Sequence, residues 1–481
     1  MNRVNMREIF VEKTFASKTV LVTGATGFLG KVLVEKLLRS CPGVEKIFIL
    51  LRAKKNETLE SRFEAFKNYI VFDNLRKVNP ESIEKLVPIN ADLLISPCAN
   101  ISDENQKILK ESVQFLFHCA AAVKFDEPLK NALQLNLIAT RNMLDLAAKF
   151  KKLEAFIHVS TAFSNTNIKM IYEKIYKPIY DYKKAIDLVE ADRDDELETV
   201  AEFALQTLPN TYVFSKNLTE QLVSDRSNLL PIAIVRPSVV CPSMLEPFPG
   251  WCDSKNGPMG VMLGASTGLL RTVHGNGEVI PDLIPCDFVV NAIIVAGASV
   301  ASNENKQLKI YNCTSSKQVP ITWNEFLDLS RAAYKEYPST KAIWFPDGRM
   351  CSNYTFYLIY FTLFQFIPAC FFDLCLLITG QKLWFVKLQR KIFDSIKNYA
   401  YFLLSTWEWE NKNCEILFNL VSLHERSTFN FDVSTLDYTK YIKNWVIGSR
   451  RYLLKLDDDS LPEAKRKFNI LFWVDMVHEV L

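Results

Sequence analysis

Tyr212 and Lys216 are the residues whose types and spacing best suit acid–base chemistry. They stand four positions apart in PNTYVFSK (209–216), so a helix would place the phenol and the ammonium on one face. The ammonium would lower the pKa of the phenol and could hold the ribose of a bound nucleotide. The phenol could then protonate an oxyanion that hydride transfer creates. The same spacing is common on surface helices, so its meaning depends on the surrounding elements.

A second segment, HVSTAFSN (158–165), supplies hydroxyl groups. Ser160 and Thr161 close a predicted strand, and a hydroxyl from either residue could donate a second hydrogen bond to the same oxyanion. The residues alone leave the choice between the two hydroxyls open.

Three glycines predict a dinucleotide site. Gly24, Gly27 and Gly30 lie in TGATGFLGK (23–31), between a predicted strand and a helical pattern of spaced leucines. The first two glycines let the backbone turn tightly and approach a pyrophosphate, and the third lets the helix pack closely on the strand. The helix N-terminus attracts the negative charge. An isolated glycine turn would mean little, but the strand before it and the helix after it match the dinucleotide pattern.

The next predicted strand, 46–51, ends at Arg52, with Lys54 and Lys55 close behind. An acidic residue near this strand end would hold the ribose 2′-hydroxyl of NADH, whereas a basic one accommodates the 2′-phosphate of NADPH. Arg52 could also be a solvated charge after a strand. Because no Asp or Glu competes at the strand end, we expect NADPH.

Further strands are predicted at 86–89, 115–119 and 155–160, separated by helical patterns such as 131–150. Alternation of this kind predicts an α/β fold with a doubly wound, mostly parallel sheet. A chain of 481 residues exceeds what a single core usually supports, so several units are expected. The predicted segments are a nucleotide-binding and catalytic domain (14–335), a hydrophobic segment (350–380), a helical domain (382–455) and an amphipathic tail (456–481).

The amino-acid composition gives no support for nucleic-acid binding or for a metal site. With 57 basic and 54 acidic residues, the chain offers no electrostatic reason to expect nucleic acid as a partner. Eleven cysteines and five histidines are scattered without metal-ligand spacing, so no metal site is expected and the thiols are expected to be reduced and to face the cytosol. Cys414 shows no disulfide partner. The first residues lack the apolar core of a secretory signal.

Together these motifs resemble the fatty acyl-CoA reductases, the alcohol-forming branch of the extended short-chain dehydrogenases. The resemblance runs from about Thr14 to about Lys455. Besides the segments above, it rests on HCAAAVKFDEPL (118–129), IVRPSVV (234–240), EPFPGW (246–251) and YNCTS (311–315), and on the extension of the tyrosine motif to PNTYVFSKNLTE (209–220).

The resemblance implies a Rossmann-type core and a set of site residues. Thr161 aligns best with the hydroxyl partner of Tyr212 and Lys216, and Ser160 is the second choice. Asn136 is implied to anchor a water or the active-site backbone, and its alternative role is a helix-packing amide. The implied cofactor contacts are Thr23, Gly24, Gly27, Phe28, Leu29 and Gly30 at the pyrophosphate, Arg52 at the 2′-phosphate, Asp92 and Leu93 at the adenine, Ala120 and Ala121 at the adenosine ribose, and Pro237 to Val239 at the nicotinamide, together with Tyr212 and Lys216.

The implied activity is reduction of a long-chain fatty acyl-CoA to the primary alcohol with two NADPH, by way of an aldehyde and with release of CoA. An enzyme that releases the aldehyde is an alternative. A sterol, sugar-nucleotide or other lipid dehydrogenase would use the same Tyr212 and Lys216. A catalytically silent NADPH-binding membrane scaffold is a rival of another class, and the intact hydroxyl, Tyr and Lys set argues against it.

Residues 350–372 form an uncharged, mostly apolar run, interrupted by Gln365 and Pro368 and followed by Asp373. Its length suits a bilayer-spanning helix, but a re-entrant or interfacial hairpin and a buried helix pair are alternatives. Length slightly favours a span over a hairpin. A basic flank follows, made of Lys382, Lys387, Arg390 and Lys391, and suits a cytosolic leaflet.

Membrane contact is the expectation for this run. The tail from Lys465 suits either a membrane-surface or partner-binding helix or a packed terminal helix. We expect a cytosol-facing active site and both chain ends in the cytosol, on the endoplasmic reticulum membrane or alternatively on the peroxisomal membrane. Oligomeric state is not predicted.

Overall fold

The computed structural model describes residues 8–53, 56–96, 98–303 and 307–480. The chain packs as two compact units, and each unit is assembled from three separate chain segments. Unit 1 comprises Met1–Val240, Ile284–Thr314 and Trp407–Val433. Unit 2 comprises Cys241–Leu283, Ser315–Thr406 and Ser434–Leu481. These units cut across the linear segments expected at 14–335, 350–380, 382–455 and 456–481, because the chain leaves unit 1 and returns to it twice.

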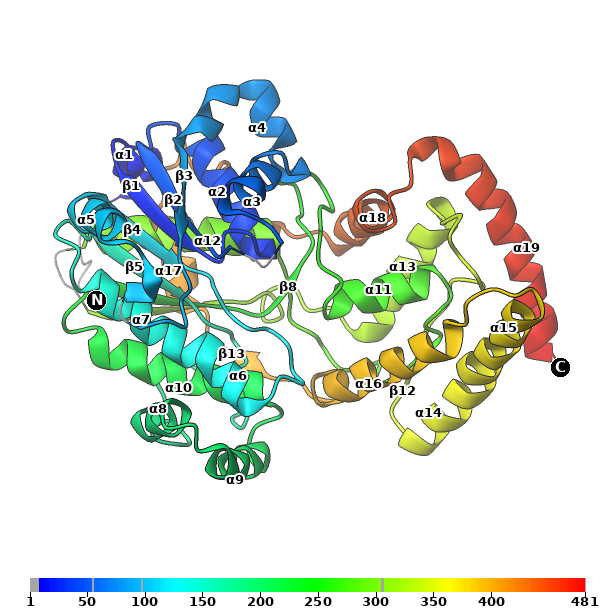
Figure 1. Ribbon diagram of the computed structural model, residues 1–481. Coiled ribbons are helices and arrows are strands. Elements are labelled where there is room, and N and C mark those ends of the chain that lie inside the picture. Colours follow the sequence, from blue (N-terminus) through cyan, green and yellow to red (C-terminus); the bar gives the residue numbers. More distant parts are fainter. Residues whose placement is uncertain (1–7, 54–55, 97, 304–306, 481) are drawn as a thin grey trace. The chain divides into compact units, whose positions relative to one another are not determined.

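A seven-stranded parallel sheet forms the centre of unit 1 (Figure 1), in the order β11-β7-β5-β4-β1-β2-β3. The chain builds β1, β2 and β3 outward in one direction and then β4, β5, β7 and β11 in the other, which confirms the predicted doubly wound fold. In such sheets ligands bind beyond the carboxyl ends of the strands where the order reverses, here between β1 and β4. The strands are β1 (Thr19–Thr23), β2 (Lys46–Leu51), β3 (Leu86–Asn90), β4 (Val113–His118), β5 (Ala155–Val159), β7 (Ile232–Pro237) and β11 (Lys309–Cys313).

Helices cover both faces of this sheet because its strands are apolar on both sides. Phe115 and Phe117 of β4 point toward α12 (Cys286–Ala301), where Gly297 leaves room for the Phe117 ring. His118, on the opposite face, bonds to Thr140 of α7 (Ala139–Ala147). Helix α2 (Phe28–Ser40) packs beside α12, and α10 (Thr211–Arg226) packs beside α7.

The segment 407–433 returns to unit 1 instead of forming part of a separate helical domain. Strand β13 (Glu408–Trp409) pairs in parallel with β6 (Met170–Ile171), and α17 (Lys412–Leu420) packs on α12 and β11. Cys414 of α17, expected to have no disulfide partner, is in hydrogen-bonding contact with the thiol of Cys313, and both are free thiols.

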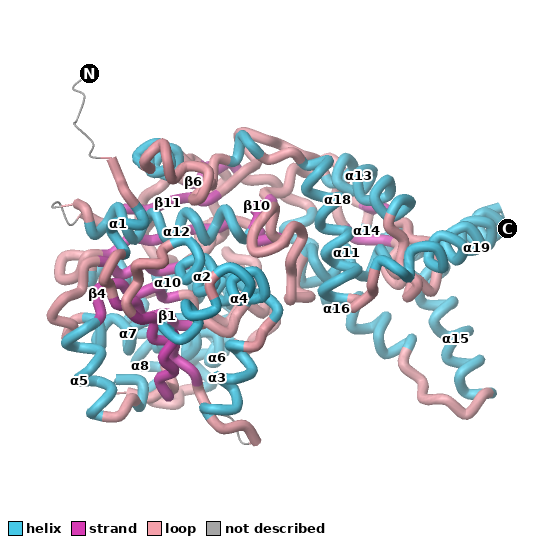
Figure 2. The backbone as a smooth tube through the Cα atoms, turned by 90° about the horizontal axis from the view of Figure 1, so that it is seen from above, coloured by secondary structure: helices cyan, strands magenta, loops and turns pink. Residues whose placement is uncertain are grey.

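Unit 2 is mainly helical. Its helices are α11 (Pro258–Ser266), α13 (Trp323–Glu336), α14 (Tyr354–Phe361), α15 (Ile367–Ile378), α16 (Phe385–Leu403), α18 (Tyr438–Gly448) and α19 (Leu461–Val480). A one-turn π-helix, Thr362–Phe366, joins α14 to α15 into a continuous helix. Figure 2 shows α15 and α16 as the two limbs of a hairpin joined by a loop.

In unit 2, two glycines let the loop EPFPGW (246–251) pack closely on α18. Gly250 has a φ of +72°, and a Cβ on it would lie 1.9 Å from the Asn444 carbonyl oxygen. A Cβ on Gly448 would lie 1.8 Å from the Gly250 carbonyl oxygen. The loop therefore sits directly on α18, at a distance that side chains at these positions would prevent.

Candidate active site

The glycine turn has the strand-turn-helix geometry expected from the sequence. β1 ends at Thr23, and α2 begins at Phe28 with Gly27 as its N-cap. Gly24 has a φ of +69°, and a Cβ on it would lie 2.7 Å from the Ala120 backbone nitrogen. No acidic side chain occupies the first turn of α2, so its N-terminus can attract a phosphate.

A chain of buried hydrogen bonds holds the ends of β1 and β4 together. The Thr23 hydroxyl accepts from the Ala120 N–H (3.2 Å) and lies 2.8 Å from His118 Nδ1, and His118 Nε2 lies 2.9 Å from the Thr140 hydroxyl. Burial, followed by the charge of Lys216, lowers the pKa of His118 to about 3. His118 is therefore neutral near pH 7 and serves as a structural link.

Asn136 anchors the backbone that follows β4. Its Oδ1 accepts from the Ala122 N–H (2.8 Å), and its Nδ2 donates to the Ala122 carbonyl and to the Ser215 hydroxyl. Both roles considered for this amide are observed, because it contacts the backbone after β4 and also packs against α10. The contact with Ser215 also ties this backbone to α10.

Tyr212 and Lys216 lie on the first turns of α10, which Asn210 caps by accepting from the Val213 N–H. The Tyr212 phenol shares a hydrogen bond with the Thr161 hydroxyl. Lys216, 2% exposed, donates from Nζ to the Val159 carbonyl at 2.9 Å. The helix thus brings the phenol and the ammonium to the carboxyl end of β5.

We expected Lys216 to lower the pKa of the phenol, but burial dominates instead. It raises the pKa of Tyr212 to about 12, against a lowering by the hydrogen bond with Thr161. Burial also lowers the pKa of Lys216 to about 8, and Glu220 opposes that shift. Tyr212 therefore keeps its proton near pH 7, as a proton donor must.

The two candidate hydroxyls have different partners. Ser160 donates to Glu220 Oε1 at 2.6 Å, and Glu220 forms a buried ion pair with Arg236 at 2.6 Å. Thr161 instead contacts Tyr212. The Ser160 hydroxyl is thus engaged in a charged network, and the Thr161 hydroxyl faces the phenol.

Sequence reasoning missed Glu220 and Arg236. The signal was available in part, because Glu220 follows Lys216 by four residues and so shares its helix face. Arg236 also donates to the carbonyls of Tyr172 and Lys174. The pair fixes the end of β5 against α10 and the loop after β6.

Two tryptophans of the returning segment hold the loop that carries Thr161. Trp409 Nε1 donates to the Ala162 carbonyl (2.8 Å), and Trp407 Nε1 donates to the Thr166 carbonyl (2.9 Å). The ring of Phe163 meets both indoles edge-on. A segment more than 240 residues away thus positions the loop that carries Thr161.

The residues expected at the adenosine end also follow strand ends. Arg52 comes directly after β2, its side chain is 60% exposed, and its Nη1 lies 3.4 Å from Asp92 Oδ2. The Leu93 carbonyl accepts from Asn142 of α7 at 2.8 Å. Arg62 donates to the Arg52 carbonyl. Lys54 and Lys55 lie outside the described residues.

Pro237 and Val239 flank the end of β7. The Pro237 carbonyl accepts from the Ala162 N–H at 2.9 Å, which brings this strand end beside the Thr161 loop. The sheet therefore gathers the predicted residues along its carboxyl edge, from Arg52 after β2 to Pro237 at the end of β7. The close approach at Gly24 and the helix N-terminus free of acidic side chains fit the pyrophosphate of a dinucleotide.

Comparison with known proteins identifies the family. Two family descriptions match, both named Male sterility protein, over residues 22–293 and 364–456. Fatty acyl-CoA reductase 1 of Rattus norvegicus is 38% identical over 463 residues, which are 96% of this chain and 90% of that protein. Fatty acyl-CoA reductase 2 of Mus musculus is 39% identical over 94% of this chain and 88% of that protein. This chain belongs to the fatty acyl-CoA reductase family.

Solved structures agree on the fold of this reductase. The reductase domain of a nonribosomal peptide synthetase from Mycobacterium tuberculosis superposes with a TM-score of 0.61 at 19% identity and covers 94% of this chain and 95% of that one. The terminal reductase domain of the myxalamid pathway gives a TM-score of 0.59 at 18% identity, over 91% of each chain. The chain is an oxidoreductase with a nicotinamide-nucleotide-binding domain, and the resemblance inferred from its motifs is confirmed.

Proposed function

We propose that this reductase converts long-chain fatty acyl-CoA to the primary alcohol with two NADPH, through an aldehyde and with release of CoA. The observation that carries the proposal is the hydrogen bond between the Tyr212 phenol and the Thr161 hydroxyl, one helical turn from Lys216 on α10. Two converging O–H donors are suited to an oxygen that gains negative charge. The names of the relatives support the acyl-CoA substrate.

A nicotinamide cofactor, when bound, would supply one hydride to each of the two reductions. In the first, Thr161 and Tyr212 stabilise the oxyanion formed at the thioester carbonyl, and its collapse expels the CoA thiolate and leaves an aldehyde. In the second, Tyr212 donates its proton to the aldehyde oxygen, which yields the alcohol. Lys216, held by the Val159 carbonyl, is placed to contact the ribose.

The test is a product assay with the full chain in detergent. Purified protein is incubated with NADPH and a panel of acyl-CoAs, and the products are identified by gas chromatography. We expect a primary alcohol and two NADPH consumed per alcohol. Accumulation of aldehyde with one NADPH consumed would contradict the alcohol-forming reaction, and no turnover of any acyl-CoA would contradict the substrate class.

NADPH preference is proposed to rest on Arg52. Hydrogen bonds to a charged group are worth about 1.5–3 kcal/mol, and the exposure of Arg52 favours the lower end. Arg52→Ala should raise the KM for NADPH by about tenfold and leave that for NADH nearly unchanged. Lys46→Ala, at the opposite end of β2, is the control. If Arg52→Ala changed the KM for NADPH and the KM for NADH equally, Arg52 would have no role in nucleotide preference.

Contact with a bilayer is proposed through the hairpin of unit 2. Among the described residues, Tyr354–Ile378 is the one helix long and apolar enough to cross a membrane; an 18-residue window of it has mean hydropathy 2.0, and 17% of that window is buried. Its two polar interruptions face the protein. Asp373 accepts from the N–H groups of Trp384, Phe385 and Val386 at the start of α16, and Gln365 accepts from the backbone of Arg271 and Thr272.

Helix α19 adds to this apolar surface. Its Asp475 is buried in an ion pair with Arg271 at 2.7 Å, so this acidic side chain is turned into the protein. The exposed apolar side chains of these helices are Phe356, Ile359, Leu363, Ile367, Phe371, Leu374, Leu377, Ile378, Ile470, Trp473, Val474, Met476 and Val477.

A one-sided hairpin fits these contacts better than a spanning helix. Helix α16 runs back along the apolar helix, with Phe385 against Phe372 and Phe393 against Phe361, each at 5.0 Å between ring centroids. It also exposes Lys387, Arg390 and Lys391. A span would carry these charges into hydrocarbon at about 2.5–3.5 kcal/mol each, whereas a hairpin leaves them at anionic headgroups.

Charge insertion into the apolar surface tests the membrane proposal. Phe371→Glu with Leu374→Glu should move the full-length protein from the membrane fraction to the soluble fraction, and Leu229→Glu, an exposed leucine of unit 1, should not. A tag at Leu481 should remain open to protease in sealed microsomes, with the protein on the endoplasmic reticulum or, alternatively, on peroxisomes. A protected tag would contradict the hairpin. Truncation before Met350 is unsuitable because it removes 407–433 from unit 1.

A further inference from the structure

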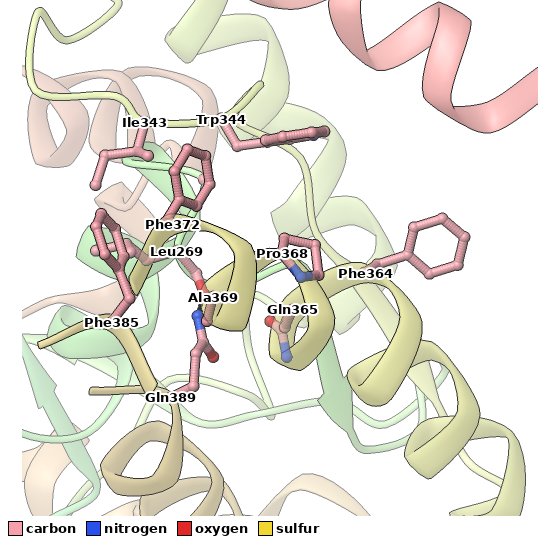
Figure 3. Close-up of a pocket in the computed structure, with 11 residues that line it drawn as sticks. Leu269, Ile343, Trp344, Phe364, Gln365, Pro368, Ala369, Phe372, Phe385 and Gln389 are labelled. Carbon is pink, nitrogen blue, oxygen red and sulfur yellow. Dashed lines mark hydrogen bonds between the residues drawn. The ribbon is translucent and has the colours of Figure 1, made fainter. Parts of the chain in front are cut away.

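A small cavity lies inside unit 2, between α15, the first turns of α16 and two loops (Figure 3). Its volume is about 30 Å³, room for about one water-sized group. Most of its wall is apolar, with the rings of Trp344, Phe372 and Phe385 among its residues. Two buried amides, Gln365 and Gln389, also line it and are 3% and 4% exposed.

Each amide uses one of its two ends and leaves the other unpaired. Gln365 Oε1 accepts from the N–H groups of Arg271 and Thr272, and Gln389 Nε2 donates to the Leu269 carbonyl at 2.8 Å. These backbone partners determine which end of each amide is oxygen and which is nitrogen. Among the described residues, Gln365 Nε2 and Gln389 Oε1 have no hydrogen-bond partner.

One donor and one acceptor in the same apolar cavity specify the chemistry of a ligand. Leaving both unpaired costs about 1–3 kcal/mol for each group. A single hydroxyl carries both an acceptor for Gln365 Nε2 and a donor for Gln389 Oε1. A carboxylate, an ester or an ether has no hydrogen to donate to Gln389, and a hydrocarbon satisfies neither atom.

We infer that this cavity binds the hydroxyl end of a long-chain primary alcohol. Only the hydroxyl would occupy the cavity, and the methylene chain would leave through its open side and continue over the exposed apolar surface of α15, where Phe371 is 62% exposed. The choice of a primary alcohol rests on the proposed function, whose product it is. The site is built from unit 2 residues and is separate from the catalytic residues, which belong to unit 1.

Photolabelling of the full chain in detergent tests this inference. The probe is a long-chain primary alcohol with a diazirine near its hydroxyl end and a terminal alkyne, and the labelled peptides are mapped by mass spectrometry. We expect label within 364–372 and 385–389. Excess unlabelled hexadecanol should reduce labelling by about tenfold, whereas its methyl ether, which lacks the donor, should not.

Two variants test whether labelling depends on this cavity or on apolar surface in general. Ala369→Leu fills the cavity and keeps both amides, because Ala369 lines it and is 3% exposed. Gln365→Glu keeps an oxygen for the N–H groups of Arg271 and Thr272 but replaces the free donor. Both should lose most of the labelling, while Gln381→Glu, an exposed residue in the loop before α16, should keep it. Thermal unfolding checks that each variant is folded.

Labelling that survives both folded variants, or that lies wholly outside these peptides, would overturn the inference. Equal competition by the methyl ether would overturn the role of Gln389, and equal competition by cholesterol would replace the primary alcohol with hydroxyl lipids in general. The experiment contains no NADPH and no acyl-CoA, so its failure is distinct from a failure of the proposed reaction.

Discussion

Tyr212→Phe should lower the rate of alcohol formation by about 10²–10⁴-fold, the usual contribution of a positioned general acid. The phenol bonds to Thr161 and, with its pKa raised to about 12, carries a proton at neutral pH. Phenylalanine retains the ring, which stacks on Phe125 with centroids 5.8 Å apart, but lacks the proton. The rate is measured from NADPH oxidation and from the alcohol formed.

The control for this variant is Tyr182→Phe. The Tyr182 hydroxyl bonds to Asp225 at 2.7 Å, away from the strand ends that carry the site, so its loss should leave the rate nearly unchanged. NADPH affinity should be similar in wild type and Tyr212→Phe, because the lost group is proposed to act on the substrate oxygen. Near-normal turnover of Tyr212→Phe would remove Tyr212 from its assigned role.

Thr161→Val should lower kcat by about 10²–10³-fold, the effect of removing one donor from an oxyanion site. Valine has nearly the shape of threonine, so the loop held by Trp409 should persist. Thr161→Ser should restore much of the rate because it returns the hydroxyl. Steady-state kinetics on one acyl-CoA separates the change in kcat from the change in KM.

Ser160→Ala provides the contrast. It removes a hydrogen bond to the buried Glu220, so it should lower the midpoint of thermal unfolding. Its kcat should fall much less than that of Thr161→Val. If folded Ser160→Ala instead lost more kcat than Thr161→Val, Ser160 would be the donor to the oxyanion and the assignment would be reversed.

Short-range patterns carried most of the correct predictions. The strand, glycine turn and helix at 19–40 could be predicted because a backbone turn with positive φ and a close approach to Ala120 require glycine. Tyr212 and Lys216 share a helix face through their own spacing. The doubly wound, mostly parallel sheet could be predicted from alternating strands and helices, because parallel strands need crossover connections.

The choice between Ser160 and Thr161 required the tertiary structure. Successive residues at a strand end point to opposite sides, and which side meets Tyr212 depends on where α10 packs. Glu220 and Arg236 decide this by engaging Ser160. The same limit applies to Trp407 and Trp409, whose contacts with the Thr161 loop have no counterpart in local spacing.

The apolar run at 350–372 also separates what the sequence determines from what the tertiary structure determines. The sequence alone determined that this segment is apolar and long enough for a membrane helix, and it showed Gln365 and Pro368 as interruptions followed by Asp373. Tertiary structure decided that Gln365 and Asp373 face protein partners, because only the packed backbone of Arg271, Thr272 and the start of α16 supplies N–H groups to receive them. Hydropathy depends on residue type, whereas the cost of a polar group depends on its partners, and those partners come from segments distant in the chain.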